Sequence, residues 1–353
     1  MASKGARNII LSVAITFFIA SCTTVANQLA KNALTYDKEK FAAPFFMAWF
    51  GTLFMIPLYP IYFLIRKIFT KASMDEINGE AFEILEGKDG RIYKELVLGL
   101  GSFTFLILWT GPPYLFGVSV QFISVSAATG IGSLSAAMVF LFSIIFLGAE
   151  FSWFKAAGIA VSIAGVVLLS LDGNFTGSVL GVCLILLWAF ITAVYNTAFK
   201  KVFGDLSLAQ VLFYQSLLGL ADFIWNTIPM LVLAFFDYDR IVWESIPWLP
   251  VIGNGIAGVA FAFGANLGIA MLNPLVVSIA FLVGIPMNAA VDIIFRGLDA
   301  GPLVYIGGVL IAIGFCFTSL PFDDWIRKLT GKKEKDAESD IKDSKDTKSS
   351  DLS

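Results

Sequence analysis

Residues 143–148 read SIIFLG, and residues 292–297 read DIIFRG, about half a chain later. Further like residues follow without a gap at the same shift: Glu150 with Asp299, Gly158 with Gly307, and Gly165 with Gly314. Two glycines seven residues apart lie on one face of a helix, where they allow a neighbouring helix to approach closely in a membrane. A gapless match of this length predicts that one half of the chain is a duplicate of the other.

The composition indicates that the solvent around this chain is lipid. Of its 353 residues, 58% are hydrophobic and only 14% are charged, whereas a soluble globule needs a polar exterior. The net charge of −3 does not favour a nucleic-acid partner. The chain has no histidine, and its three cysteines lie inside apolar runs at Cys22, Cys183 and Cys316. We therefore predict no catalytic, metal or cofactor site.

Apolar stretches of about 17–25 residues predict ten membrane-spanning helices. The expected spans are 9–30, 44–65, 96–118, 121–147, 152–171, 178–199, 208–235, 247–271, 274–295 and 301–320. Residues 66–95 are expected to form a charged loop, and residues 321–353 a disordered tail rich in Lys, Asp and Ser. Most Lys and Arg residues fall on the side that carries both termini, so both termini are predicted to be cytosolic.

The repeat orders these spans into two halves. It carries the fourth span onto the ninth and the fifth onto the tenth, and a second match links VANQLAK (25–31) to VYNTAFK (194–200), in the first and sixth spans. Five spans in each copy turn the second copy upside down. We therefore predict an all-α membrane protein built from two inverted five-helix repeats, 1–171 and 172–320. This pattern is typical of transporters with a site near the midplane.

Polar residues inside the predicted spans are candidates for that site, because an ionisable group in hydrocarbon is costly. Asp222 lies near the centre of the span 208–235, with Gln215 and Asn226 on the same helix face and Tyr214 beside it. We expect these four residues to bind substrate. The alternative is a structural carboxylate that is bonded to a neighbouring donor.

The span 274–295 carries a similar stripe. Asn288 is expected to contact substrate, and Asp292 and Arg296 to serve a gate or coupling role, or else to form a plain ion pair. Asn27 in the first span is a further candidate for substrate contact, with hydrogen bonding between helices as its alternative.

The third span contains WTGPPY (109–114). Two successive prolines remove two backbone donors, so we expect a broken helix at this place, as found at many transporter sites. Trp109 and Tyr114 flank the expected break and would stack on a ring-shaped solute, or anchor the helix at the membrane interface.

Several stretches resemble the drug/metabolite transporter superfamily, and more closely the F subfamily of solute carrier family 35, whose members include proposed thiamine transporters. They are FLGAEFSWFKAAGIAVSIAGVVLLSLDG (146–173), APFFMAWFGTLFMIPLYP (43–60), IPW (246–248), NLGIAMLNPLVVSIAFLVGIPMNAAVD (266–292) and LPFDDWIRKL (320–329). The resemblance implies a ten-helix carrier that moves a small organic solute by alternating access.

The nucleotide-sugar exchangers of the same superfamily offer an alternative. A diphosphate needs a cationic partner in a low-dielectric cavity, but no Lys or Arg lies between Lys201 and Arg240 or between Arg240 and Arg296. The negative charge of Asp222 instead suits thiamine or a related heterocyclic cation, to which Trp109 would add a cation–π contact.

An alternative from another class is an intramembrane aspartyl protease that uses Asp222 and Asp292. Neither residue stands in the G-x-G-D or Y-D context that such enzymes use, so we expect no enzyme activity. A lipid scramblase or a structural membrane protein is also compatible with the sequence. The sequence leaves open the oligomeric state, and whether the protein resides in the plasma membrane or an endomembrane.

Overall fold

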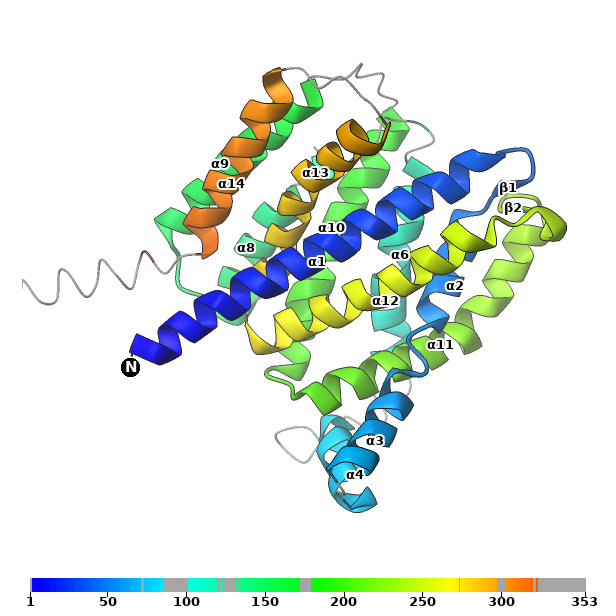
Figure 1. Ribbon diagram of the computed structural model, residues 1–353, viewed down its shortest axis with the longest axis horizontal. Helices are drawn as coiled ribbons and strands as arrows, with labels where there is room; N and C mark the ends of the chain where they lie inside the picture. The colour runs from blue at the N-terminus through cyan, green and yellow to red at the C-terminus, as the bar shows by residue number, and fades with distance from the viewer. Residues whose placement is uncertain are drawn as a thin grey trace, which may run out of the picture.

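Helices make up most of the structure, a computed structural model (Figure 1). The described residues are 2–70, 73–85, 101–119, 122, 128, 131–132, 134–171, 179–272, 274–296, 302–319 and 322. The first half contains α1 (Ala2–Tyr36), β1 (Phe41–Ala42), α2 (Pro44–Leu53), α3 (Leu58–Phe69), α4 (Met74–Phe82), η1 (Glu83–Leu85), α6 (Gly101–Ser119), α8 (Leu134–Leu147) and α9 (Trp153–Leu171). The second half contains α10 (Val179–Phe203), α11 (Leu208–Phe235), β2 (Arg240–Ile241), η3 (Trp243–Ser245), α12 (Trp248–Met271), α13 (Pro274–Arg296) and α14 (Pro302–Ser319).

Each of the ten expected spans overlaps a helix, except that α2 and α3 share the second. The fourth, 121–147, is matched by α8 from Leu134 onward, and most of its earlier residues lie outside the described part of the chain. Among the described residues, five helical segments are long and apolar enough to cross a membrane: Ile10–Leu34, Pro44–Phe69, Val179–Phe203, Leu208–Phe235 and Trp248–Met271. Shorter apolar helices lie at Leu134–Leu147, Trp153–Gly165, Val277–Asn288 and Tyr305–Thr318. The chain is therefore an α-helical, multi-pass membrane protein, while ten spans, the repeats and the side of the termini remain predictions.

The helices pack in pairs that join the two halves of the sequence. Helix α1 runs beside α12 and also contacts α13, whereas α10 runs beside α6 and also contacts α8 (Figure 1). Helix α2 contacts α11, and α9 packs along α14 at one edge of the bundle (Figure 1). The largest apolar core lies among α1, α10, α11 and α12.

The glycines of the sequence repeat lie in the contact between α9 and α14. A Cβ atom on Gly158 would lie 2.8 Å from the carbonyl oxygen of Gly314, and one on Gly165 would lie 2.7 Å from that of Gly307. No side chain fits at such distances, so the two backbones touch. The prediction that these glycines allow close helix packing is confirmed. The helices run antiparallel, because the earlier glycine of α9, Gly158, meets the later glycine of α14, Gly314.

The prediction of a helix break at Pro112 and Pro113 is wrong. Helix α6 runs without interruption through both prolines. Each proline removes one N–H donor, but the turns on either side keep theirs, and α6 is packed against α10, α2 and α11. Tertiary contacts therefore hold the helix through a sequence that would break it in isolation.

The break lies instead in the second span, between Leu53 and Leu58. There the backbone bonds shorten to three-residue turns, such as Leu58 N to Met55 O at 3.1 Å. The Ser216 hydroxyl of α11 accepts from Tyr59 N at 2.8 Å and donates to Met55 O at 3.2 Å. In an unbroken helix these two groups would bond to each other, so one hydroxyl repairs the missing bond.

Part of the expected loop 66–95 is helical in the described residues 66–70 and 73–85. Helix α3 continues to Phe69, and α4 follows with Ser73 at its N-terminus, where the Ser73 side chain accepts from Glu76 N at 3.1 Å. Ile77 and Ala81 of α4 are buried, and α4 contacts α11. The expected loop is therefore partly an amphipathic helix. Of the predicted tail, all residues except Phe322 lie outside the described part of the chain.

Candidate functional site

A fully buried carboxylate lies at the contact between α6 and α11. Helix α11 begins with a capping box, in which the Ser207 side chain accepts from Gln210 N and the Gln210 side chain accepts from Ser207 N. About four turns later, the helix places Asp222 with no exposed surface. A carboxylate in this position has been removed from water and needs partners within the protein or in a ligand.

Asp222 has two such partners, one from each helix. Asn226 Nδ2 donates to Asp222 Oδ1 at 2.8 Å, and Thr110 Oγ1 donates to the same oxygen at 3.4 Å. Asn226 Nδ2 also lies 3.3 Å from Thr110 Oγ1. The other carboxylate oxygen, Oδ2, has no hydrogen-bond partner among the described residues. The site thus binds one oxygen of Asp222 and leaves the other available.

Gln215 lies two turns before Asp222 on the same face of α11. Its side chain is fully buried, and neither the oxygen nor the nitrogen of its amide has a partner among the described residues. Buried polar groups in proteins are nearly always paired with protein or water. Gln215 and Asp222 together offer an acceptor and a donor that a polar solute or water could satisfy.

Tyr214 and Trp109 belong to an aromatic cluster beside this face. The Tyr214 ring lies 5.1 Å from those of Phe199 and Phe203, and its hydroxyl interacts with that of Tyr195. The Trp109 ring lies 5.4 Å from the Tyr195 ring.

Tyr195 also donates to Asn266 Oδ1 at 2.8 Å. Sequence reasoning missed Tyr195, although its position beside Asn196 in a matched repeat segment was a usable indication.

Tyr114 lies toward the end of α6 and has no described contact with Asp222. Its ring packs edge-on against Phe45 at 5.4 Å, and it interacts electrostatically with Asp239 in the loop after α11. This placement matches the alternative of an anchor near the membrane interface. Sequence reasoning also missed Thr110, which stands one turn before Tyr114 in an apolar run where a threonine attracts no notice.

Helices α1 and α13 form a second polar contact. Gln28 Nε2 donates to Asn288 Oδ1 at 3.2 Å, and Asn288 Nδ2 donates to Gly284 O of its own helix at 2.9 Å. Thr24 Oγ1 donates to the same carbonyl at 3.4 Å. Asn288 is therefore used in a bond between helices. Asn27, the residue before Gln28 on α1, is partly exposed.

The predicted gate residues Asp292 and Arg296 lie on α13, but their side chains are outside the described part of the structure. Within the described ranges no group of three or more Cys, Asp or Glu side chains could hold a metal ion.

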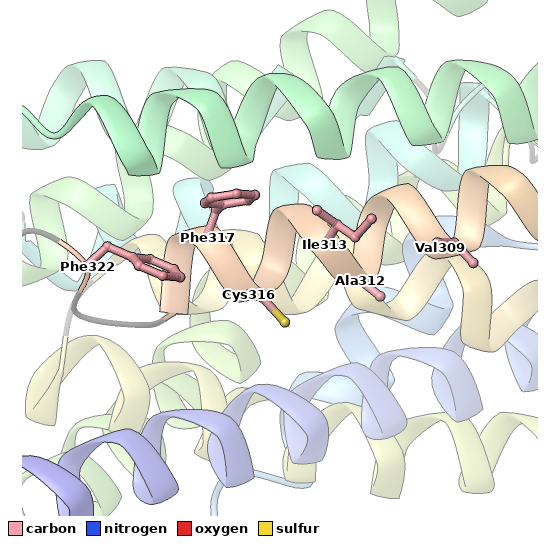
Figure 2. A pocket seen from close by; sticks show the side chains of 6 residues that line it. All are labelled: Val309, Ala312, Ile313, Cys316, Phe317 and Phe322. Atoms are coloured by element: carbon pink, nitrogen blue, oxygen red, sulfur yellow. The ribbon is translucent and has the colours of Figure 1, made fainter.

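A separate cavity of about 320 Å³ lies along α14 (Figure 2). It is lined by Val309, Ala312, Ile313, Cys316, Phe317 and Phe322. Figure 2 shows these side chains projecting from one helix and its end, with no charged group among them. The cavity is lined by apolar side chains at the edge of the bundle and does not belong to the polar site on α11.

Comparison with known proteins finds solute carriers among the relatives of this chain. No family model matches it. Human solute carrier family 35 member F3 is 29% identical over 350 residues, which cover 94% of this chain and 80% of the relative. Mouse solute carrier family 35 member F4 is 26% identical over 339 residues, which cover 93% of this chain and 68% of the relative. A solved crystal structure aligns with a TM-score of 0.61 at 17% identity over 87% of this chain and 95% of that chain, which shows a shared fold.

Proposed function

We propose, from the homology to solute carrier family 35, that this chain carries a small organic cation of the thiamine type across a membrane by alternating access. The homologues are solute carriers, so the chain is a membrane transporter and not an enzyme. The observation that carries the substrate class is the fully buried carboxylate of Asp222, whose second oxygen has no partner among the described residues.

The helix contacts support a bundle of two inverted repeats. When each helix is replaced by its expected copy in the other half, α1 becomes α10, α6 becomes α12 and α8 becomes α13. The pair α1–α12 then becomes α10–α6, and the pair α1–α13 becomes α10–α8, and all four pairs are in contact. Contacts that are preserved when the two halves are swapped are expected of inverted-repeat transporters, in which one half rocks against the other.

The glycine contacts support the same relation at the level of single residues. Exchange of the two copies turns the contact Gly158–Gly314 into Gly307–Gly165, and both contacts are present. An antiparallel contact that maps onto itself in this way is expected of two halves related by an axis in the membrane plane.

The charge of the site supports a cationic solute. Among the described residues, Asp222 is held by the neutral donors Thr110 and Asn226 alone, and no Lys or Arg occurs in α11. A cationic solute would neutralise the buried carboxylate. Trp109, the residue before Thr110, has its ring 5.4 Å from the Tyr195 ring and would offer a cation–π contact to such a solute.

The alternative solute is a nucleotide sugar, which the same superfamily also carries. A diphosphate carries two negative charges and would meet a carboxylate without a nearby arginine or lysine on α11. Like charges at short range in a low-dielectric site cost several kcal/mol. The negative site therefore favours the cation.

Uptake by the purified protein in liposomes tests the proposal. Labelled thiamine is expected to enter, labelled nucleotide sugar is not, and Asp222→Asn is expected to lower thiamine uptake at least about tenfold, as loss of a buried charge partner costs more than 1.4 kcal/mol. Asp75→Asn, at an exposed carboxylate of α4, is the matched control and should retain uptake.

Two outcomes would contradict parts of the proposal. Native uptake in Asp222→Asn would remove the charge argument. Exchange of a nucleotide sugar for a nucleotide monophosphate would overturn the solute class.

A further inference from the structure

We propose that two related contacts, one at each end of α11, are gates that open in turn, and that the carboxylates of Asp239 and Glu83 hold them closed. The Asp239 gate joins the loop after α11 to the start of α2, and the Glu83 gate joins α4 and η1 to the start of α11. In Figure 1 the first lies beside β1 and β2, and the second beside α4. Their opening in turn rests on the proposed function, in which the two halves move by alternating access.

The Asp239 gate closes on a helix start that lacks its own cap. Helix α2 begins at Pro44, and Ala43 before it has no side chain that can accept a hydrogen bond. Asp239 supplies the acceptor from the other half of the sequence: Phe46 N donates to Asp239 Oδ2 at 2.7 Å, and Phe45 N also donates to this carboxylate. The helix dipole favours an ionised carboxylate at the first turn of a helix. The charge of Asp239 therefore stabilises the closed contact.

Backbone pairing extends the Asp239 gate. Phe41 lies opposite Ile241 and Ala42 opposite Arg240 in an antiparallel bridge. Beside this bridge lies a buried apolar cluster drawn from both halves: Ala33, Phe41, Ala43, Phe46, Met47, Met230, Ile246 and Val251. Asp239 is itself buried. The halves therefore cannot separate at this end without exposing both the carboxylate and the apolar cluster to water.

The Glu83 gate lies at the other end of α11. Gln210 Nε2, on the first turn of α11, donates to Glu83 Oε2 at 3.3 Å. The next residue, Ile84, is buried in the largest apolar core together with Leu206 and Val211, which flank the start of α11. Helix α4 and η1 both contact α11. A carboxylate and an apolar side chain of the first half thus close on the start of a helix in the second half.

The expected duplication relates the two gates. Exchange of the halves puts the second span, α2 and α3, in the place of the seventh, α11. A loop after the seventh span that closes on the start of the second then becomes a segment after the second span that closes on the start of the seventh. Both contacts are present. In an inverted repeat, two contacts related in this way lie at opposite membrane faces, as alternate opening of a carrier requires.

The two gates are not equally tight. Asp239 is buried and accepts from backbone N–H groups that have no other cap, and a helix cap of this kind stabilises its helix. Glu83 is exposed and bonds to a side-chain amide, while Ser207 already caps α11. An exposed side chain also bonds to water, so its bond to Gln210 adds little. The Asp239 gate is therefore the tighter of the two in this structure.

Spin labels on the full chain test the gates by pulsed electron resonance, in the absence of any solute. Labels are attached at exposed positions on both sides of each gate, in chains whose native cysteines are replaced by alanine. The pairs are Lys38→Cys with Glu244→Cys for the Asp239 gate, and Asp75→Cys with Lys201→Cys for the Glu83 gate.

Asp239→Ala removes the cap of α2. We expect the ratio of short to long distances across the Asp239 gate to fall about fivefold, the usual effect of losing a helix cap. In the same variant the ratio across the Glu83 gate should rise about fivefold, because one gate closes as the other opens. Glu83→Ala should change both ratios in the opposite directions, by about twofold. Asp37→Ala is the matched control and should leave both ratios native, because Asp37 pairs with Lys40 of its own loop.

Distances measured without solute separate the gates from the proposed solute. A chain that shows the coupled distance changes but carries neither thiamine nor nucleotide sugar keeps its gates and loses its proposed solute. A chain that carries thiamine, but whose distances do not respond to Asp239→Ala, loses the gates alone.

The response of the second label pair decides between a gate and a local cap. Longer distances across the Asp239 gate with no change across the Glu83 gate would show that Asp239 only caps α2, and would overturn the proposal. Unchanged distances across the Asp239 gate would also overturn it. If Asp239→Ala does not fold, Asp239→Asn keeps one acceptor and loses the charge. It should shift both ratios in the same directions by a smaller factor, and native ratios in that variant would overturn the gates.

Discussion

At Thr110 a single hydroxyl contacts both polar side chains of α11 that form the candidate site. It donates to Asp222 and lies within reach of the Asn226 amide. Neither neighbour carries a positive charge, so the carboxylate depends on neutral donors for its position. Loss of the Thr110 hydroxyl would leave the buried Asp222 with Asn226 as its single partner among the described residues.

We expect Thr110→Val, which keeps the shape and removes the hydroxyl, to raise the KM for thiamine about tenfold. A hydrogen bond to a charged group contributes about 1.5–3 kcal/mol. Initial rates of uptake into liposomes measure the change.

Thr110→Ser should restore most of the affinity. Thr197→Val is the control, because the Thr197 hydroxyl bonds only to the Ala193 carbonyl of its own helix. A KM for Thr110→Val equal to that of the native protein would show that Asp222 is positioned without it.

At this scale the sequence predicts charged residues better than neutral ones. Asp222 stands out because a carboxylate in an apolar run is costly. Thr110 does not, since a threonine in a helix can satisfy its hydroxyl on its own backbone, and only the meeting of α6 with α11 gives it a partner. Asn288 was expected to contact substrate, which stays a prediction. Its bond to Gln28 could not be predicted, because it depends on a contact between helices far apart in the chain.

Among the elements, the second span shows why a proline pattern alone misplaced the break. A proline frees a backbone carbonyl, and the outcome depends on what the surroundings offer to it. Pro112 and Pro113 lie in a helix held by three neighbours, whereas the turn before Pro57 meets Ser216, which bonds to both freed groups. Ser216 is far from Pro57 in the sequence, so no local pattern could identify it.

Ser216→Ala is expected to lower the stability of the protein by about 1–3 kcal/mol, the cost of leaving a buried backbone group without a partner. The apparent Tm in detergent, followed by tryptophan fluorescence, measures the loss. Ser21→Ala is a suitable control, because the Ser21 hydroxyl is exposed and bonds only to its own helix. Equal Tm values for the two variants would contradict the repair of the break by Ser216.

The contact of α9 with α14 gives a second prediction for elements. Gly314→Val would place a side chain against Ser162 and the backbone of Gly158, and overpacking of this kind costs about 1–3 kcal/mol. The same thermal measurement should show a lower Tm. Gly258→Ala is the control, since a Cβ atom there meets no atom within 4 Å. If the Tm of Gly314→Val stays at the native value, the two helices do not touch as described.

For the whole molecule, the sequence predicts the positions of the apolar helices because a membrane imposes a minimum length on them. The expected copies could also be aligned, since the glycines that allow close packing recur in register. The amphipathic α4 was missed, because a charged segment with a short buried stripe reads as a loop when the helix against which it packs is not known.

The ten-span topology predicts which loops share a side of the membrane. In sealed vesicles, cysteines placed at Lys38 and Glu244 should react with a membrane-impermeant maleimide from one side only, and a cysteine at Asp75 from the other. The native cysteines are replaced by alanine for this purpose, and permeabilised vesicles provide the control for total labelling. Labelling of Lys38→Cys and Asp75→Cys from the same side would rule out the predicted topology.

The seam between α9 and α14 has a consequence for how the polypeptide comes together. Each partner offers the other a pair of glycines seven residues apart, so we expect recognition at this seam not to need a covalent tether. A gene cut between the codons for the two predicted five-helix repeats should therefore yield a pair of fragments that associate in the bilayer. Each fragment would also be able to meet a second copy of itself in the opposite orientation, which is how such a fold could have begun before the two sequences were fused.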